Sequence, residues 1–213
     1  MLADTNVPKP LVWLLCGAPL VWLAAAVVRE IGSPGSALGP DPGEAVVLFL
    51  GEWGIRFLLL ALAVSPLRRL LGWPALARVR RLVGLWAFAY LALHFLAYLT
   101  FLAGFDWAAI VDDLAERTYI TAGALALLAL VPLAITSTRG WQRRLGRRWL
   151  ELHRLVFFAA VLGLVHLWWL IKDGYGDAVA YSVVFLLLMA ERIGRRRTHH
   201  GRAREAALRT VQR

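Results

Sequence analysis

Hydrophobic positions along this chain fall into long blocks rather than into the periodic stripes of a soluble domain. An apolar run of about 18 or more residues has the length of a transmembrane helix. We therefore expect an all-α polytopic membrane helix bundle with six transmembrane helices. The six predicted spans lie at approximately residues 10–28, 46–66, 83–103, 119–136, 150–171 and 177–192.

The polar segments between these blocks alternate in charge. Residues 29–44 and 105–117 carry three and four acids, each with one arginine. Residues 68–81 carry five arginines and no acid, and residues 139–154 carry six arginines and one glutamate. Because basic residues gather on the cytoplasmic side of a membrane, we expect both termini and the two arginine-rich segments in the cytoplasm. The acidic segments and the turn at 172–177 are then expected in the periplasm.

This arrangement divides the chain into three parts. A short cytoplasmic N-terminus, 1–9, precedes one transmembrane domain, 10–192, and a basic cytoplasmic tail, 193–213, follows it. The tail is too short for a flavin or nicotinamide domain, and the chain has no glycine-rich phosphate loop or Rossmann motif. We expect the tail to be solvated and able to contact anionic membrane lipid.

Composition agrees with a membrane protein and narrows the range of partners. Hydrophobic residues make up 60% of the 213 residues, compared with about 45–50% in soluble domains. The formal net charge is +10, but nearly all of it lies between the apolar blocks, so we expect no nucleic-acid partner. The single cysteine, Cys16, supports neither an internal disulfide nor a thiolate metal site.

Few ionisable residues lie within the predicted spans, and each is costly enough in a bilayer to be a candidate for function. Five of them are candidates for the functional site: Glu52, Arg56, His94, His153 and His166.

His94 and His166 are expected at nearly the same depth. Both of their spans run from the cytoplasm to the periplasm, and His94 lies 13 residues after Arg81, about 20 Å along a helix. His166 lies 12 residues after Arg154, about 18 Å. Two neutral imidazoles at one level on neighbouring helices can provide both axial ligands of a haem iron. The alternative for each is a histidine that only forms a hydrogen bond to a neighbouring helix.

His153 is expected to point in another direction. It precedes His166 by 13 residues, which places the two side chains about 140° apart around an ideal helix. It lies near the cytoplasmic boundary, where the third span offers only Arg80 and Arg81 at a matching depth. Both an interfacial residue and a ligand of a haem iron remain open for His153.

Glu52 and Arg56 are spaced for an ion pair within one helix. Arg56 precedes Arg68 by 12 residues, about 18 Å, which places it level with His94 and His166. Its guanidinium is therefore a candidate partner for a haem propionate. The alternative is that Glu52 and Arg56 only neutralise each other inside the bundle.

Two long segments carry a family resemblance. The sequences "RRLVGLWAFAYLALHFLAY" and "RRLGRRWLELHRLVFFAAVLGLVHLWWLIKDG", together with "SPLRRL" and "ERTYITAGALALLALVPLAITS", resemble the MsrQ (YedZ) family. Its members are haem-binding membrane subunits of periplasmic protein-methionine-sulfoxide reductase systems, within the wider ferric-reductase-like transmembrane family. The resemblance covers nearly all of the chain from the second span to the sixth.

The resemblance implies an electron-transfer role. Such proteins are multi-pass b-type cytochromes of the bacterial inner membrane, with one or two haem b groups, and FMN is also attributed to them. They pass electrons from the quinone pool or a cytosolic flavin reductase to a periplasmic molybdopterin subunit, which reduces methionine sulfoxide in oxidised proteins. The sulfoxide chemistry itself takes place on that partner.

Carried over by motif, the family's haem histidines fall on His94, His153 and His166. The wider family has four histidines, and the third span here has only one of them. No motif locates FMN, although the arginine-rich segments are the natural place for its phosphate.

Two alternatives to this function remain. One is a quinone- or flavin-linked cytochrome b or ferric reductase that serves another periplasmic acceptor. The other is a proton-coupled transporter that uses the buried His, Glu and Arg side chains as a relay.

Overall fold

The structure is a computed structural model that describes residues 9–170 and 174–211, and within these residues it contains helices and no strand. The elements are α1 (Lys9–Gly32), α2 (Pro42–Leu70), α3 (Leu76–Ala97), the π-helical η1 (Tyr98–Leu102), α4 (Trp107–Glu116), α5 (Thr118–Ile135), α6 (Arg139–Leu145), α7 (Arg147–Leu152), α8 (Leu155–Leu170) and α9 (Gly176–Val211).

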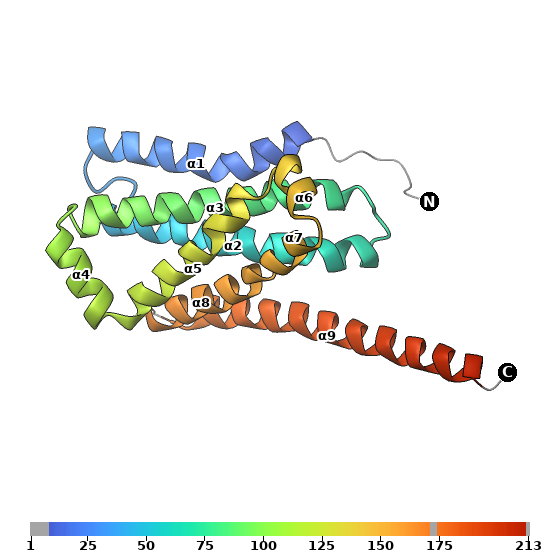
Figure 1. Ribbon diagram of the computed structural model, residues 1–213. Coiled ribbons are helices and arrows are strands. Elements are labelled where there is room, and N and C mark those ends of the chain that lie inside the picture. The colour runs from blue at the N-terminus through green and yellow to red at the C-terminus, as the bar shows by residue number, and fades with distance from the viewer. Residues whose placement is uncertain (1–8, 171–173, 212–213) are drawn as a thin grey trace.

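Two antiparallel helix pairs form the centre of the bundle. Helix α2 packs along α3, and α5 packs along α8, while contacts of α3 with α5 and of α2 with α8 join the pairs (Figure 1). Helix α1 lies against α2 and α3, and α9 lies against α2 and α8. The space between the two central pairs is where a cofactor of a helix bundle is normally held.

Five segments of the described chain are long and apolar enough to cross a membrane: Lys9–Gly32, Pro42–Leu70, Leu76–Leu102, Thr118–Ile135 and Arg147–Leu170. They contain the first five predicted spans except for their last residues in three cases: 103 of the third, 136 of the fourth and 171 of the fifth, the last of which is outside the described residues. The protein is therefore a multi-span membrane helix bundle.

The sixth predicted span, 177–192, lies within α9, which is not among these five helices. Its apolar stretch runs only from residue 178 to 190, between Asp177 and Glu191. Thirteen helical residues rise about 20 Å, whereas the hydrocarbon core is about 30 Å thick. The count of six spans and the side on which the termini lie stay predictions.

The boundaries expected for the two terminal parts are not tested by the fold. Helix α9 continues through the expected boundary at 192 and ends at Val211. The N-terminal part, 1–9, lies outside the described residues apart from Lys9, and so do residues 171–173 at the expected periplasmic turn.

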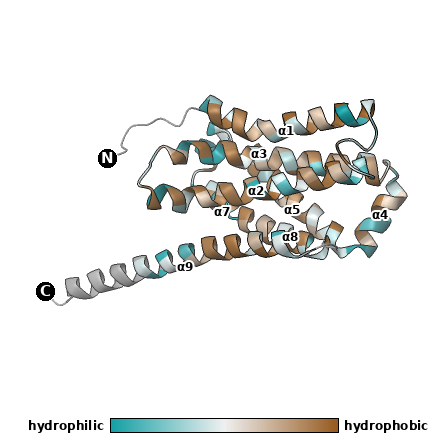
Figure 2. Ribbon diagram, turned by 180° about the vertical axis from the view of Figure 1, so that it is seen from behind, coloured by the Kyte–Doolittle hydropathy of each residue, from teal (hydrophilic) through white to brown (hydrophobic). Residues whose placement is uncertain are grey.

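The charged segments separate to opposite ends of the bundle. The start of α1, the α2–α3 connection and helices α6 and α7 share one end, and α4 lies at the other end with the α1–α2 connection (Figure 1). Hydrophobic residues dominate the helices between the two ends (Figure 2). This separation is what the alternating charges of the sequence require.

Local structure appears in both acidic segments between the predicted spans. The acidic segment contains α4 because the Asp106 side chain caps this helix, accepting hydrogen bonds from the backbone N–H groups of Ala108 and Ala109. In the α1–α2 connection the buried Glu30 carboxylate accepts hydrogen bonds from the N–H groups of Ala37 and Leu38, both at 2.9 Å. Each carboxylate satisfies backbone donors that a loop would otherwise leave unpaired.

The core on the side of α1 is built around one tyrosine. Tyr90 of α3 is fully buried, and its hydroxyl donates a 2.8 Å hydrogen bond to the backbone carbonyl of Cys16 in α1. Its ring lies 5.1 Å from that of Phe57 in α2 and 6.0 Å from that of Trp86. Tyr90 thus ties α1, α2 and α3 together with both a polar and an aromatic contact.

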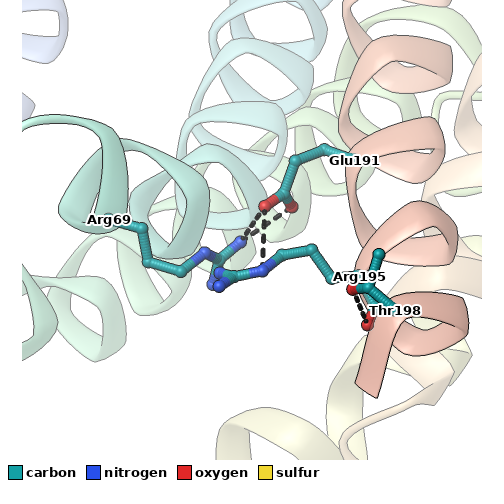
Figure 3. A network of polar contacts seen from close by, with 4 residues as sticks. All are labelled: Arg69, Glu191, Arg195 and Thr198. Atoms are coloured by element: carbon teal, nitrogen blue, oxygen red, sulfur yellow. Dashed lines mark hydrogen bonds and ion pairs between the residues drawn. The ribbon is translucent and has the colours of Figure 1, made fainter. Parts of the chain in front are cut away.

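Helix α9 is attached to α2 by a charged network (Figure 3). Arg69, near the end of α2, places one guanidinium nitrogen 2.7 Å from both carboxylate oxygens of Glu191 in α9. Arg195 lies one turn further along α9, with its Nε 3.8 Å from the same carboxylate. The network fixes the arginine-rich end of the bundle to the last helix.

Candidate functional site

His94 of α3 and His166 of α8 face each other across the centre of the bundle. Their ring centroids are 6.1 Å apart, and the ring planes are inclined by 81°. The two side chains therefore lie at one level in the bundle, as the residue spacing predicted. The two rings come from different helix pairs, so the distance between them is set by the packing of one pair against the other.

Each of these rings is held by a backbone carbonyl. The Nδ1 atom of His94 lies 2.8 Å from the carbonyl oxygen of Val47 in α2, and that of His166 lies 2.6 Å from the carbonyl oxygen of Tyr119 in α5. A carbonyl oxygen can only accept, so each Nδ1 carries the proton and donates it. When such a ring is neutral, its Nε2 is unprotonated, which is the form of histidine that binds a metal.

A cavity of about 480 Å³ lies between the two helix pairs and is lined by both histidines. This volume is in the range of about 300–1,000 Å³ that small-molecule sites occupy. Its walls are mostly apolar and come from both pairs, and they include Leu48, Ile55, Leu58, Leu91, Phe95, Ile120, Leu127, Leu130, Ala159 and Leu167.

The polar part of the cavity lining lies toward the acidic segments. Tyr98 donates a 2.6 Å hydrogen bond to the Asp113 carboxylate, and Arg117 lies 3.1 Å from the same group. The Asp113 carboxylate raises the pKa of the Arg117 guanidinium, so Arg117 stays charged. This group was not predicted from the sequence, although the i,i+4 spacing of Asp113 and Arg117 beside a span was a signal for it.

The arrangement fits a haem better than a free metal ion. The two ring centroids are 6.1 Å apart, so His94 and His166 are the residues that would hold a haem iron between the helix pairs. Within the described residues there is no cluster of three or more His, Cys, Asp or Glu side chains that could hold a metal. Two histidines alone suit a metal whose remaining ligands come from a macrocycle.

His153 lies outside this cavity, at the break between α7 and α8. Its Nδ1 donates a 3.0 Å hydrogen bond to the carbonyl of Trp149, and its ring stacks on the Trp149 ring at 3.8 Å. Its Nε2 is buried and has no hydrogen-bond partner among the described residues. The different direction expected for His153 agrees with this placement, and its role as an iron ligand stays a prediction.

Arg56 does not line the cavity, whereas Glu52 does. The Arg56 guanidinium lies 2.7 Å from the Glu52 carboxylate and donates a 2.8 Å hydrogen bond to the Tyr181 hydroxyl of α9. It also lies over the Trp53 ring, 5.2 Å from the centroid. The ion pair expected from the sequence is therefore present, and the contact of Arg56 with a haem propionate stays a prediction.

Comparison with known proteins matches residues 50–164 to the family described as "Ferric reductase like transmembrane component". A protein from Rhodospirillum rubrum is 48% identical over 195 residues, which is 90% of this chain and 91% of the relative. Relatives from Caulobacter vibrioides (47% over 189 residues, 87% of each chain) and Xanthomonas oryzae pv. oryzae (42% over 187 residues, 87% of this chain and 85% of the relative) are similar. No solved structure matches the chain.

All three relatives are named "Protein-methionine-sulfoxide reductase heme-binding subunit MsrQ". The identity extends over nearly the whole length of both chains, and it includes the helices that carry both cavity histidines. This chain belongs to the MsrQ family, within the ferric-reductase-like transmembrane proteins.

Proposed function

We propose that this protein is the b-type cytochrome subunit of a methionine-sulfoxide reductase system in a bacterial inner membrane. It passes electrons from the quinone pool or a cytosolic flavin reductase to a periplasmic molybdopterin subunit, which repairs oxidised proteins. The chain crosses the membrane six times, with both termini in the cytoplasm. The relatives' names supply the reductase system and the haem.

The single observation that carries the proposal is the pair formed by His94 and His166. Two neutral rings 6.1 Å apart, each with its Nδ1 donating to a carbonyl, line an apolar cavity inside a membrane bundle. A haem bound between them supplies one-electron chemistry.

The protein's own contribution is to position and tune these ligands. The carbonyls of Val47 and Tyr119 fix the tautomer and orientation of the two rings and raise the basicity of their Nε2 atoms. The apolar walls exclude water and lower the local dielectric, which sets the reduction potential of a bound iron. We propose His94 and His166 as the main candidates for the ligands of a haem iron.

The cavity lies nearer the acidic end of the bundle, since Val47 and Tyr119 are close to the first residues of α2 and α5. In the proposed orientation this end faces the periplasmic partner. His153 lies nearer the arginine-rich end, with its Nε2 buried and unpaired among the described side chains. We propose that His153 is a ligand of a second haem b on the cytoplasmic side.

The cavity does not provide the groups that FMN needs for its phosphate. Arg117 is its one lining guanidinium, and that group is already engaged by Asp113. FMN stays a prediction from family resemblance, and we assign no residue and no step to it.

The test is a dithionite-reduced minus oxidised absorption spectrum of the purified protein from haem-replete cells, with the haem quantified. We expect b-type bands, and we expect His94→Ala and His166→Ala each to lose at least about tenfold in haem affinity. His153→Ala is the matched comparison and should keep the haem of the cavity pair. Colourless wild-type protein would overturn the proposal and favour a transporter.

The acceptor requires a separate experiment, because another periplasmic acceptor fits the same cavity. We expect a periplasmic molybdoenzyme to co-purify with the tagged protein, and deletion to abolish methionine-sulfoxide reduction in the periplasm. A haem protein that passes neither test is a cytochrome b for a different acceptor.

A further inference from the structure

The two cavity histidines belong to two matching structural units. In the first unit, Val47 supplies the carbonyl, Gly51 follows four residues later on α2, and His94 projects from α3. In the second unit, Tyr119 supplies the carbonyl, Gly123 follows four residues later on α5, and His166 projects from α8. In both units the histidine follows its carbonyl partner by 47 residues.

The two glycines lie directly beside the histidine rings. A Cβ atom built on Gly51 would be 2.9 Å from Nδ1 of His94 and 3.0 Å from its Cε1. A Cβ atom built on Gly123 would be 2.8 Å from Nδ1 of His166 and 3.1 Å from its Cε1. Contacts this short do not persist in folded proteins, so a side chain at either position forces the ring to move.

The atom that would be displaced is the one that holds the ring in place. In each unit the Nδ1 that meets the added Cβ is also the Nδ1 that donates to the carbonyl one helical turn earlier. A methyl group at Gly51 or Gly123 therefore breaks or bends this hydrogen bond as it moves the ring. The glycine and the carbonyl together fix the position of one imidazole ring.

We propose that Gly51 and Gly123 are positioning residues that set the separation of the His94 and His166 rings for binding one metal between them. The inference rests on the proposed haem function, and it adds the part of the structure that fixes the ligand geometry. In membrane helices glycine commonly allows a close approach between neighbouring helices. At Gly51 and Gly123 the atoms that approach belong to the histidine rings.

Gly84 has open space beside it and provides a control. A Cβ atom on Gly84 of α3 would meet only Ala61, at 4.0 Å, which is an ordinary contact. Gly84→Ala should therefore be tolerated, although it lies on the same helix as His94.

The experiment compares Gly51→Ala, Gly123→Ala and Gly84→Ala with the wild type, each purified in detergent as the full chain. Haem affinity, midpoint potential and the spin state from the absorption spectrum are measured together with helical content and monodispersity. We expect Gly51→Ala and Gly123→Ala to bind haem about 10- to 100-fold more weakly, in line with loss of a group that orients a ligand. The haem that remains should show high-spin character and a shifted potential, whereas Gly84→Ala should match the wild type.

The outcomes separate this inference from the function on which it rests. Wild-type protein without haem contradicts the proposed function itself. Wild-type protein with haem, together with unchanged spectra and affinity in both variants, overturns the positioning role alone. Loss of helical content or of monodisperse protein in the two variants also overturns it, because the glycines would then serve helix packing.

Discussion

Glu52 is an acidic side chain in the wall of the histidine cavity, and Arg56 compensates its charge from outside. The pair is only partly buried, with side-chain exposures of 40% and 37%. Arg56 is held in place by the Tyr181 hydroxyl as well as by Glu52. The charge beside the cavity is therefore set by two residues that can be changed separately.

Removing Arg56 is expected to lower the midpoint potential of a bound haem. Arg56→Leu leaves the Glu52 carboxylate uncompensated, and a negative charge favours the oxidised iron by an amount on the order of tens of millivolts. Loss of a contact between Arg56 and a propionate would act in the same direction. A redox titration of the purified variant measures the shift.

The double variant Glu52→Gln with Arg56→Leu distinguishes these two causes. If Arg56 acts through Glu52, the double variant recovers a potential close to that of the wild type. If Arg56 binds a propionate directly, the potential stays low. An unchanged potential and haem content in Arg56→Leu would exclude both roles.

At the scale of the elements, α9 depends on its connection to α2, because among the described helices α2 and α8 are its main neighbours. The Arg69–Glu191 pair supplies two charge-assisted contacts at 2.7 Å, with both side chains about 30% exposed. Such a pair holds a helix better than an ordinary surface ion pair, since water competes for it less.

Glu191→Gln should loosen α9 without disturbing the histidine cavity. Hydrogen bonds to charged groups contribute about 1.5–3 kcal/mol, and partial exposure reduces the expected loss to about 1 kcal/mol. We expect a lower midpoint of thermal unfolding in detergent and faster proteolytic cleavage within α9. The haem content should not change.

Arg195→Gln is the matched control for this prediction. Its Nε lies 3.8 Å from Glu191 and its side chain is 46% exposed, so its removal should have little effect. Equal stability of Glu191→Gln and Arg195→Gln would show that the network does not hold α9.

Much of the whole molecule follows from patterns that act along the sequence. The lengths of the apolar blocks predicted six spans, and five of these lie on helices that are able to cross a membrane, because bilayer thickness sets helix length directly. Counting residues from Arg81 and Arg154 brought His94 and His166 to one level, because helical rise is constant. Such arguments need no knowledge of which helices are neighbours.

The remaining features depend on packing between helices and were not predicted. The close contacts of Gly51 with the His94 ring and of Gly123 with the His166 ring depend on the register in which α2 packs on α3 and α5 packs on α8. Asp113 and Arg117 join the cavity only because α4 folds back toward α5. One signal was present, since Gly51 precedes His94 by the same 43 residues that separate Gly123 from His166.

The orientation of the whole molecule can be tested with single cysteines in a Cys16→Ala background. Ser36→Cys, between α1 and α2, and Tyr175→Cys, before α9, should react in intact spheroplasts with a maleimide that cannot cross membranes. Thr138→Cys, between α5 and α6, should react only after the membrane is opened, since arginine-rich segments stay in the cytoplasm. A fluorescent protein fused after Arg213 should fluoresce, because such fusions mature in the cytoplasm. Labelling of Tyr175→Cys together with a dark fusion would place both ends of α9 in the periplasm, and the protein would then have five spans.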